Sequence, residues 1–386
     1  MIRPVYLDNA ATTRLDPRVL EAMLPYLTDR YGNAASRTHA FGWEAEEAVE
    51  SARREVAAVI GADPSAIAFV SGATEADHLA LRGAVGAYRT KGRHLIVSAI
   101  EHSAVLEAAE SLERHGCEVT RLPVDRDGRV APDQLAAAIR PDTVLASIMA
   151  GNNEIGTQND LPALGAVCRE RGVIFHTDAT QAFGRVGIEV DADRIDLLSC
   201  SAHKVHGPKG VGALFVRRRG PRVALEAQQR GGGQEGGLRA GSLNVPGIVG
   251  FGAAARLLRE ESTESARIAA LRDRLEQELL ASIPGAYRNG GNGPRLPGIT
   301  NLGIDGLEAE ALLLSLRGLA LSTGSACASA SLEPSHVLLA IGRGPFEARN
   351  SLRLSLGRFT TAEEIDRAVE EVRRAVTELR STGAGC

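Results

Sequence analysis

The feature that most constrains the fold is a regular alternation of short β-rich runs with helical stretches between residues 66 and 216. Helical patterns separate most of the runs, at residues 75–88, 104–115, 132–140 and 161–171. Such alternation predicts an α/β fold, a mostly parallel seven-stranded sheet covered by helices. The seven runs expected to form its strands are residues 66–70, 94–98, 119–122, 144–148, 173–177, 195–199 and 213–216.

The pattern changes after about residue 250. A long charged amphipathic helix is predicted at 254–280, and a second α+β region begins near 298–302 and ends in a helix at 363–380. We therefore expect a large domain at 15–255 and a smaller domain formed by 1–14 and 256–386. Before the sheet, residues 37–60 read as a helix that Gly61 ends.

Charge and cysteine content narrow the class of protein. The formal net charge is −4, and a nucleic-acid or anionic-membrane surface would need a basic excess. No run approaches the ~20 apolar residues that span a bilayer, and residues 1–6 lack a signal-peptide core. The cysteines have no close pair, which predicts neither a disulfide framework nor a metal site and favours the cytoplasm. They are Cys117, Cys168, Cys200, Cys327 and Cys386.

Two charged residues stand where a sheet would present them to a ligand. Lys204 lies between a predicted strand and a glycine-rich turn, and Schiff-base chemistry needs an amine in a fixed position. An ordinary surface lysine is the alternative, and Lys209 is a competing candidate. Asp178 follows the predicted strand 173–177, at the end where open α/β sheets bind ligands. There it either pairs with a pyridinium nitrogen, worth ~4 kcal/mol at ~4 Å and an effective dielectric of ~20, or caps a helix.

A third segment joins the strand 66–70 to the following helix. Its sequence, Ser-Gly-Ala-Thr at 71–74, forms a glycine-containing turn that would offer backbone N–H groups and a helix N-terminus to a phosphate. Many strand-to-helix turns share this composition, so the segment by itself is a weak indication.

Together these segments resemble the fold-type I pyridoxal-phosphate (PLP) enzymes, and within them the class-V aminotransferase family with its cysteine desulfurases of the iron–sulfur-cluster class. The resemblance covers nearly the whole chain, and the order and spacing of its motifs are specific. The other motifs that carry it are Tyr-Leu-Asp-Asn-Ala-Ala-Thr-Thr at 6–13, Glu-His at 101–102, Asn-Asn-Glu-Ile-Gly at 152–156, Gly-Gly-Gly-Gln-Glu at 231–235 and Arg-Leu-Ser-Leu-Gly-Arg-Phe at 353–359.

The resemblance implies a role for each matching residue. Lys204 would hold PLP as a Schiff base and, once free, remove the substrate's α-proton, while Asp178 would pair with the ring nitrogen. Gln181 would bond the phenolic oxygen, and His102 would stack on the ring and carry protons. Asn153 and Arg353 would bind the substrate carboxylate, for which a guanidinium fork is suited. The phosphate would be held by Ala73, Thr74, Ser201 and His203, with Ser242 reaching it from the other subunit of a homodimer.

One cysteine stands in a run of small polar residues, Ser-Thr-Gly-Ser-Ala-Cys-Ala-Ser-Ala-Ser at 322–331. That composition suits an exposed segment, and the match to the family's longer catalytic loop implies that Cys327 is the nucleophile. Its thiolate would attack the sulfur of L-cysteine, alanine would leave, and Cys327 would carry a persulfide. Burial as a small hydrophobe is the alternative, and it suits Cys117, Cys168 and Cys200.

Departures and rival functions remain open. Three residues depart from the usual family pattern: Ala34 replaces a proline, Gln234 a histidine and Ser242 a threonine. The last two changes bear on how finely the site residues are positioned. The sulfur acceptor, a scaffold or carrier protein, could serve iron–sulfur assembly, tRNA thiolation or DNA sulfur modification; no direct nucleic-acid binding is expected. Another PLP enzyme, such as a selenocysteine lyase or an aminotransferase, would keep Lys204 and Asp178 without needing Cys327. A non-catalytic binding protein would bind no PLP.

Overall fold

The computed structural model describes residues 3–323 and 333–381, and its largest element is the predicted seven-stranded sheet. The order is β2-β8-β7-β6-β5-β3-β4, and only β8 runs against its neighbours, β2 and β7. The mostly parallel sheet is thus confirmed, and every strand lies within two residues of its predicted range. The strands are β2 (Ile67–Val70), β3 (His94–Ser98), β4 (Glu118–Leu122), β5 (Thr143–Ser147), β6 (Ile174–Asp178), β7 (Leu197–Ser201) and β8 (Gly212–Val216).

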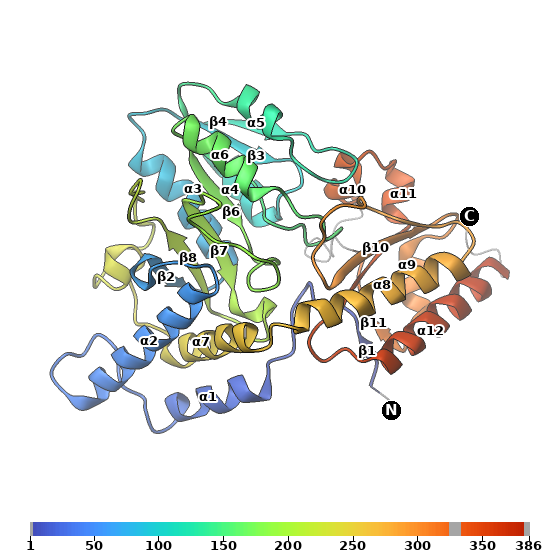
Figure 1. Ribbon diagram of the computed structural model, residues 1–386, viewed down its shortest axis with the longest axis horizontal. Coiled ribbons are helices and arrows are strands. Elements are labelled where there is room, and N and C mark those ends of the chain that lie inside the picture. Colours follow the sequence, from blue (N-terminus) through green and yellow to red (C-terminus); the bar gives the residue numbers. More distant parts are fainter. Residues whose placement is uncertain (1–2, 324–332, 382–386) are drawn as a thin grey trace.

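Helices cover both faces of this sheet (Figure 1). Successive residues of a strand point to opposite faces, so Leu95 and Val97 pack with α3 (Ala73–Ala87) and α4 (Ser103–Arg114), whereas Ile96 joins the other layer. That layer consists of α2 (Ala40–Ala58), α5 (Pro132–Ala138), α6 (Leu161–Glu170) and α7 (Val245–Glu260). Outside it, α1 (Pro17–Leu27) packs on α7.

A second hydrophobic core lies beside the large sheet. In it β10 (Ile299–Ile304) pairs antiparallel with β9 (Ala286–Arg288) and β12 (Ser351–Ser355), and α8 (Glu264–Ser282) packs alongside α12 (Ala362–Ser381), as Figure 1 shows. The N-terminal β1 (Val5–Tyr6) pairs in parallel with β11 (Leu319–Ala320), which brings Val5 and Leu7 into the same core. The remaining helices are α9 (Ala309–Ser315), α10 (His336–Ala340) and α11 (Pro345–Arg349).

The predicted single helix at 254–280 is wrong. The structure has two helices there, because α7 ends at Glu260 and α8 begins at Glu264. Ser262 and Thr263 lie between them, and such residues favour helix ends because their side chains compete for backbone hydrogen bonds. The helix predicted at 37–60 is confirmed as α2, and Gly61 beyond its end has a φ of +63°, a conformation that favours glycine.

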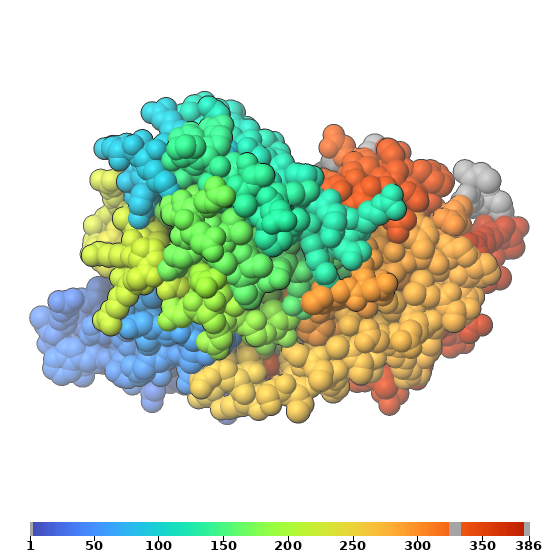
Figure 2. All heavy atoms as spheres, turned by 45° about the horizontal axis from the view of Figure 1, so that its top comes forward, coloured from blue at the N-terminus to red at the C-terminus, as the bar shows by residue number. Residues whose placement is uncertain are grey.

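The topology brings the carboxyl ends of β2, β3, β5, β6 and β7 to one edge of the sheet, because these strands share a direction. The second core lies beside the sheet, whereas α1 and α2 protrude at the opposite end of the molecule from α12 (Figure 2). Within the described part of the chain, the structure contains no helix both long enough and apolar enough to traverse a bilayer.

Candidate active site

The five strand ends surround a cavity of about 370 Å³, and most of the predicted site residues line it. The segment after β2 supplies the turn at 71–74, and the segments after β3 and β5 supply His102 and Asn153. Asp178 is the last residue of β6, rather than the residue after the strand. The predicted residues on the cavity wall are Ala73, Thr74, His102, Asn153, Asp178, Gln181, Ser201, His203, Lys204 and Arg353.

Lys204 ends a short 3-10 turn, η2 (Ala202–Lys204), that follows β7. Its Nζ donates to the carbonyl oxygens of Ala10 and Ala11 at 2.6 and 2.8 Å. Thr13 fixes the turn, because its N–H and its hydroxyl both donate to the carbonyl of His203, at 3.0 and 2.9 Å. The N-terminal segment, distant in sequence, therefore holds the lysine in the cavity.

Asp178 is the carboxylate that faces the cavity, and it is 5% exposed. Its Oδ1 accepts a hydrogen bond from Thr180 N at 2.8 Å. Two residues earlier on the same face, His176 contacts the hydroxyls of Ser147 and Ser199 at 2.8 and 3.0 Å, and burial lowers the pKa of His176 to about 4. Because the imidazole of His176 is neutral, it does not form an ion pair with Asp178, and the carboxylate can pair with a cation in the cavity.

Asp77 of α3 is a second acid behind Asp178, and it is fully buried. Its Oδ1 lies 3.7 Å from His176 Nε2. Burial, and secondarily the charge of Asp178, raises the pKa of Asp77 well above its ordinary value. Burial thus favours the protonated form of Asp77, and of the two carboxyl groups only Asp178 lines the cavity.

The part of the cavity that would bind a phosphate lies at the start of α3. The helix N-cap is Gly72, whose lack of a side chain leaves the first N–H groups of the helix without a capping partner from that residue. The corner is tight, since a Cβ on Gly212 would lie 2.8 Å from Gly72 Cα. Burial, aided by Lys204 and Lys209, lowers the pKa of His203 to about 4, so its ring is neutral.

These features fit PLP. The helix N-terminus suits a phosphate, Asp178 suits a protonated ring nitrogen, and the amine of Lys204 lies on the same cavity wall. Gln181 donates from Nε2 to Ala10 O at 2.8 Å, while its buried Oε1 has no hydrogen-bond partner in the described residues. Such a buried polar atom on the cavity wall needs a hydrogen-bond donor that the described residues do not supply.

His102 caps α4, and its Nδ1 accepts a hydrogen bond from Ala104 N at 3.1 Å. A neutral ring in that arrangement carries its proton on Nε2. The preceding Glu101 is fully buried, and burial raises its pKa to about 8, although Ser98 Oγ and Met149 N each donate to its Oε1 at 2.7 Å. Burial therefore favours the neutral form of the carboxyl group of Glu101, the residue next to His102 in the chain.

Arg353 reaches the cavity from β12 in the second core and is 2% exposed. Its Nη1 donates to the carbonyl of Asn153 at 3.1 Å, and its Nη2 donates to Asp8 Oδ1 at 2.8 Å. A buried guanidinium beside Asn153 is suited to a substrate carboxylate.

Sequence reasoning missed several residues of the site. Asp8, Ala10 and Ala11 lie in the motif at 6–13 that carried the resemblance, but the motif itself gave them no role. Arg185, whose Nη2 donates to the carbonyl of Lys204, had no signal in the sequence.

One predicted site residue does not line the cavity, and another cannot be placed in the part of the chain that the structure describes. Ser242 is exposed and is not among the residues that line the cavity of its own chain. Cys327 lies outside the described residues. Cys168 and Cys200 fit the expectation of ordinary core cysteines: burial raises the thiol pKa of Cys168 to about 12 and also raises that of Cys200.

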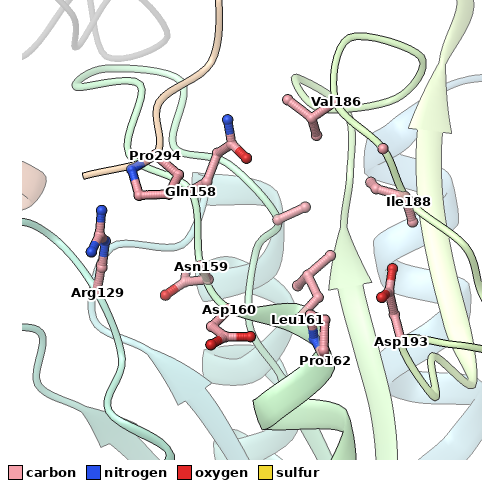
Figure 3. A pocket seen from close by; sticks show the side chains of 12 residues that line it. Arg129, Gln158, Asn159, Asp160, Leu161, Pro162, Val186, Ile188, Asp193 and Pro294 are labelled. Atoms are coloured by element: carbon pink, nitrogen blue, oxygen red, sulfur yellow. The ribbon is translucent and has the colours of Figure 1, made fainter.

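A second pocket, of about 320 Å³, shares no lining residue with the first (Figure 3). Arg129 and Asp193 lie on opposite walls. Asp160, between them, caps α6 by accepting from Ala163 N at 3.1 Å, and Asp193 accepts from Glu189 N at 3.0 Å. Both carboxylates thus have structural partners. Over the part of the chain that the structure describes, no cluster of side chains is suited to a metal ion.

Comparison with known proteins gives a consistent family. The model of the aminotransferase class-V family matches residues 5–368. Cysteine desulfurase IscS of Anaeromyxobacter dehalogenans is 52% identical over 378 residues, which is 98% of this chain and 93% of that protein. A solved NifS-like protein is 36% identical, covers 97% of this chain and all of its own, and superposes with a TM-score of 0.90. The structure "SspA in complex with cysteine" is 38% identical over 92% of this chain and 99% of its own, with a TM-score of 0.82.

The resemblance inferred from the motifs is thereby confirmed, as are the fold type, the enzyme class and the PLP cofactor, on which this family depends. The chain belongs to the class-V aminotransferase family and, within it, to the cysteine desulfurases.

Proposed function

We propose that the protein removes sulfur from L-cysteine, releases L-alanine and places the sulfur on Cys327 for an acceptor protein. The observation that carries this proposal is the convergence of Lys204, Asp178 and Arg353, from three distant segments, on one cavity. A cysteine complex among the related structures supports the substrate.

The cofactor's place follows from the charges of the cavity. PLP, when bound, withdraws electrons from the α-carbon of an amino acid, and this requires a protonated ring nitrogen. The carboxylate of Asp178 would accept a hydrogen bond from that nitrogen and so stabilise its protonated form. The N–H groups of Ala73 and Thr74, with Ser201 and His203, would hold the phosphate, and Gln181 would bond the phenolic oxygen.

The substrate's place follows from Arg353. Its guanidinium would bind the α-carboxylate together with Asn153, which directs the α-amino group toward the cofactor. Lys204, on the cavity wall, would remove the α-proton, and His102 would supply a proton from Nε2 near the sulfur.

The sulfur would then pass to Cys327. Its thiolate attacks the substrate sulfur, an S–S bond forms, and the Cβ–S bond breaks. The electron pair left at Cβ would take up a proton, Lys204 would return to Cα the proton that it removed, and L-alanine would leave. Cys327 is four residues after Thr323, and four residues of chain span at most about 14 Å. Ser322, the residue before Thr323, is hydrogen-bonded through its backbone to Arg353 on the cavity wall, so the chain that leads to Cys327 begins beside the proposed substrate site.

A homodimer is part of the proposal. Apolar side chains are exposed on and beside α1 and α2, which protrude from the molecule: Leu20, Leu24, Leu27, Tyr31, Phe41 and Trp43. A surface of this kind is characteristic of an interface. In a homodimer the exposed Ser242 of one subunit would complete the phosphate site of the other.

We also propose that the chain divides into a large domain at 15–255 and a small domain formed by 1–14 and 256–386. The proposed location is the cytoplasm. The division is supported by a hydrophobic core around β10 that is separate from the two clusters on the faces of the large sheet. A thiol nucleophile needs a reducing compartment. The acceptor is a scaffold or sulfur-carrier protein.

The test compares alanine release from L-cysteine, under a reductant that regenerates the thiol, in the wild-type protein and in Cys327→Ser. We expect the variant to lose nearly all turnover while keeping the cofactor's absorbance. Cys117→Ser is the matched control, since burial raises the pKa of its thiol and it lies outside the cavity. Full activity of Cys327→Ser would instead favour a selenocysteine lyase or an aminotransferase.

A further inference from the structure

The segment that carries Cys327 is preceded and followed by residues attached to the cavity walls. Before it, Ser322 and Arg353 exchange backbone hydrogen bonds, with Arg353 N donating at 2.7 Å and Ser322 N donating at 3.5 Å. After it, Ser335 and His336 begin α10 and contact the loops that follow β5 and β3. Both attachments thus involve residues of, or next to, the proposed substrate site.

The second attachment depends on a buried side-chain pair. Glu154, directly after Asn153, is 3% exposed, and Ser335 is 5% exposed. Ser335 Oγ donates to Glu154 Oε2 at 2.6 Å and accepts from Leu338 N at 3.2 Å. Because a hydroxyl has a single proton, the donor capacity of Ser335 is used entirely on Glu154.

A parallel contact reinforces the same attachment. His336 Nε2 donates to the carbonyl of Glu101 at 3.0 Å, next to His102. The basic side chains that face Glu154 come from three elements, His336 of α10, Arg353 of β12 and His102 before α4. They favour the carboxylate form of Glu154, whereas burial opposes it and raises its pKa. The pair is therefore enclosed among the residues that would handle the substrate, although neither of its side chains lines the cavity.

We propose that Glu154 and Ser335 are positioning residues for sulfur transfer, fixing where the Cys327 segment rejoins the fold. Their bond sets the rate at which sulfur reaches Cys327 and leaves cofactor binding and substrate capture unchanged. The inference rests on the proposed function, since it takes Cys327 as the sulfur acceptor. The physical reason is that a misplacement of about 1 Å between reacting groups costs on the order of 100-fold in rate.

The experiment separates two steps in single turnovers of the PLP-loaded protein. The change in cofactor absorbance on adding L-cysteine reports capture, and mass spectrometry of the quenched Cys327 peptide reports sulfur transfer. The variants are Ser335→Ala, Glu154→Ala, their double mutant and the conservative Ser335→Thr. The matched control is Thr300→Val, because Thr300 Oγ1 donates to the buried Glu276 at the same 2.6 Å within the second core. The dissociation constant for PLP is measured for every variant.

We expect sulfur transfer to slow about 10- to 100-fold in both alanine variants, with capture and PLP affinity within about twofold of wild type. The double mutant should be no slower than the slower single mutant, Ser335→Thr should recover most of the rate, and Thr300→Val should change neither step. Wild-type sulfur transfer in Ser335→Ala, or an equal loss of both steps, would overturn the inference. Absence of any persulfide on Cys327 in the wild-type protein would instead overturn the proposed function.

Discussion

Arg353 and Asp8 form an ion pair between residues 345 positions apart, with Nη2 donating to Oδ1 at 2.8 Å. The guanidinium is nearly buried, and the aspartate side chain is 21% exposed. Nη2 takes part in both of the two-point arrangements by which a guanidinium binds a carboxylate. Asp8 therefore offsets the charge that the proposed substrate carboxylate would meet.

The variant Asp8→Asn should bind L-cysteine more tightly. It keeps an oxygen that accepts from Nη2 but removes a negative charge beside the incoming carboxylate, so KM should fall about three- to tenfold with kcat unchanged. Steady-state kinetics with L-cysteine measure this. Binding of cysteamine, which has no carboxylate, should not change.

The matched control for Asp8→Asn is Asp273→Asn. Asp273 likewise pairs with a nearly buried arginine, Arg272, at 2.7 Å, but in the second core away from the cavity. Its kinetics should equal those of the wild type. A higher KM in Asp8→Asn would mean that Asp8 is needed to orient Arg353, contrary to the expectation.

Lys204→Ala should abolish turnover, a loss of at least about 1,000-fold, because no other amine occupies its position. The sequence has only two further lysines, Lys91 and Lys209. Of the three lysines, Lys204 is the one whose Nζ donates hydrogen bonds to the carbonyls of Ala10 and Ala11 beside the cavity. Borohydride reduction followed by peptide mapping should link PLP to Lys204 in the wild type and to no residue in the variant. Lys91→Ala, distant from the cavity, is the control.

Glu101 should make stability depend on pH. Burial raises its pKa to about 8, from an ordinary value of 4.5, so the folded protein holds a proton that the unfolded chain releases. The free energy of unfolding contributed by this group should therefore fall as the pH rises from about 5 to 8. The glutamine in Glu101→Gln cannot ionise, so in this variant the free energy of unfolding should depend less on pH between about 5 and 8. Urea denaturation of the PLP-free protein at a series of pH values measures this.

The control for that experiment is Glu113→Gln. A hydrogen bond from Arg121 lowers the pKa of Glu113, so its contribution is lost only in more acidic solution. If Glu101→Gln left the slope between pH 5 and 8 as steep as in the wild type, Glu101 would not be the proton-holding group.

Leu24→Arg should convert the proposed dimer into a monomer, because burying an unpaired charge in an apolar interface costs several kcal/mol. Sedimentation velocity measures the change. Leu314→Arg is a matched control, since Leu314 is also strongly exposed but lies on α9, far in sequence from α1. A dimer that persists in Leu24→Arg would exclude this surface as the interface.

Much of the large sheet could be predicted from the sequence because its strands, except the edge strand β4, are buried on both faces and read as continuous β-rich runs. The same pattern predicted Asp178 at the carboxyl end of this strand, although one residue beyond it rather than as its last residue. The break between α7 and α8 did not, since the charged amphipathic pattern continues across Ser262 and Thr263, and only their local hydrogen-bonding preference marks the end of α7.

The site was predictable only where a motif marks it. Lys204 and Arg353 lie in distinctive segments, whereas the pairing of Arg353 with Asp8 and of Glu154 with Ser335 joins residues 345 and 181 positions apart. Nothing in local sequence specifies such partners, because they depend on how the second core packs beside the sheet. Asp77 and Glu101 likewise appear as ordinary acidic residues until their burial is known.

The most direct test of the account is mass spectrometry of the Cys327 peptide after a single turnover of the PLP-loaded protein with L-cysteine. The account predicts a mass gain of one sulfur atom on Cys327 and one L-alanine released per sulfur transferred. Release of alanine or pyruvate with Cys327 unmodified would contradict it, because the cofactor chemistry would then proceed without the sulfur acceptor.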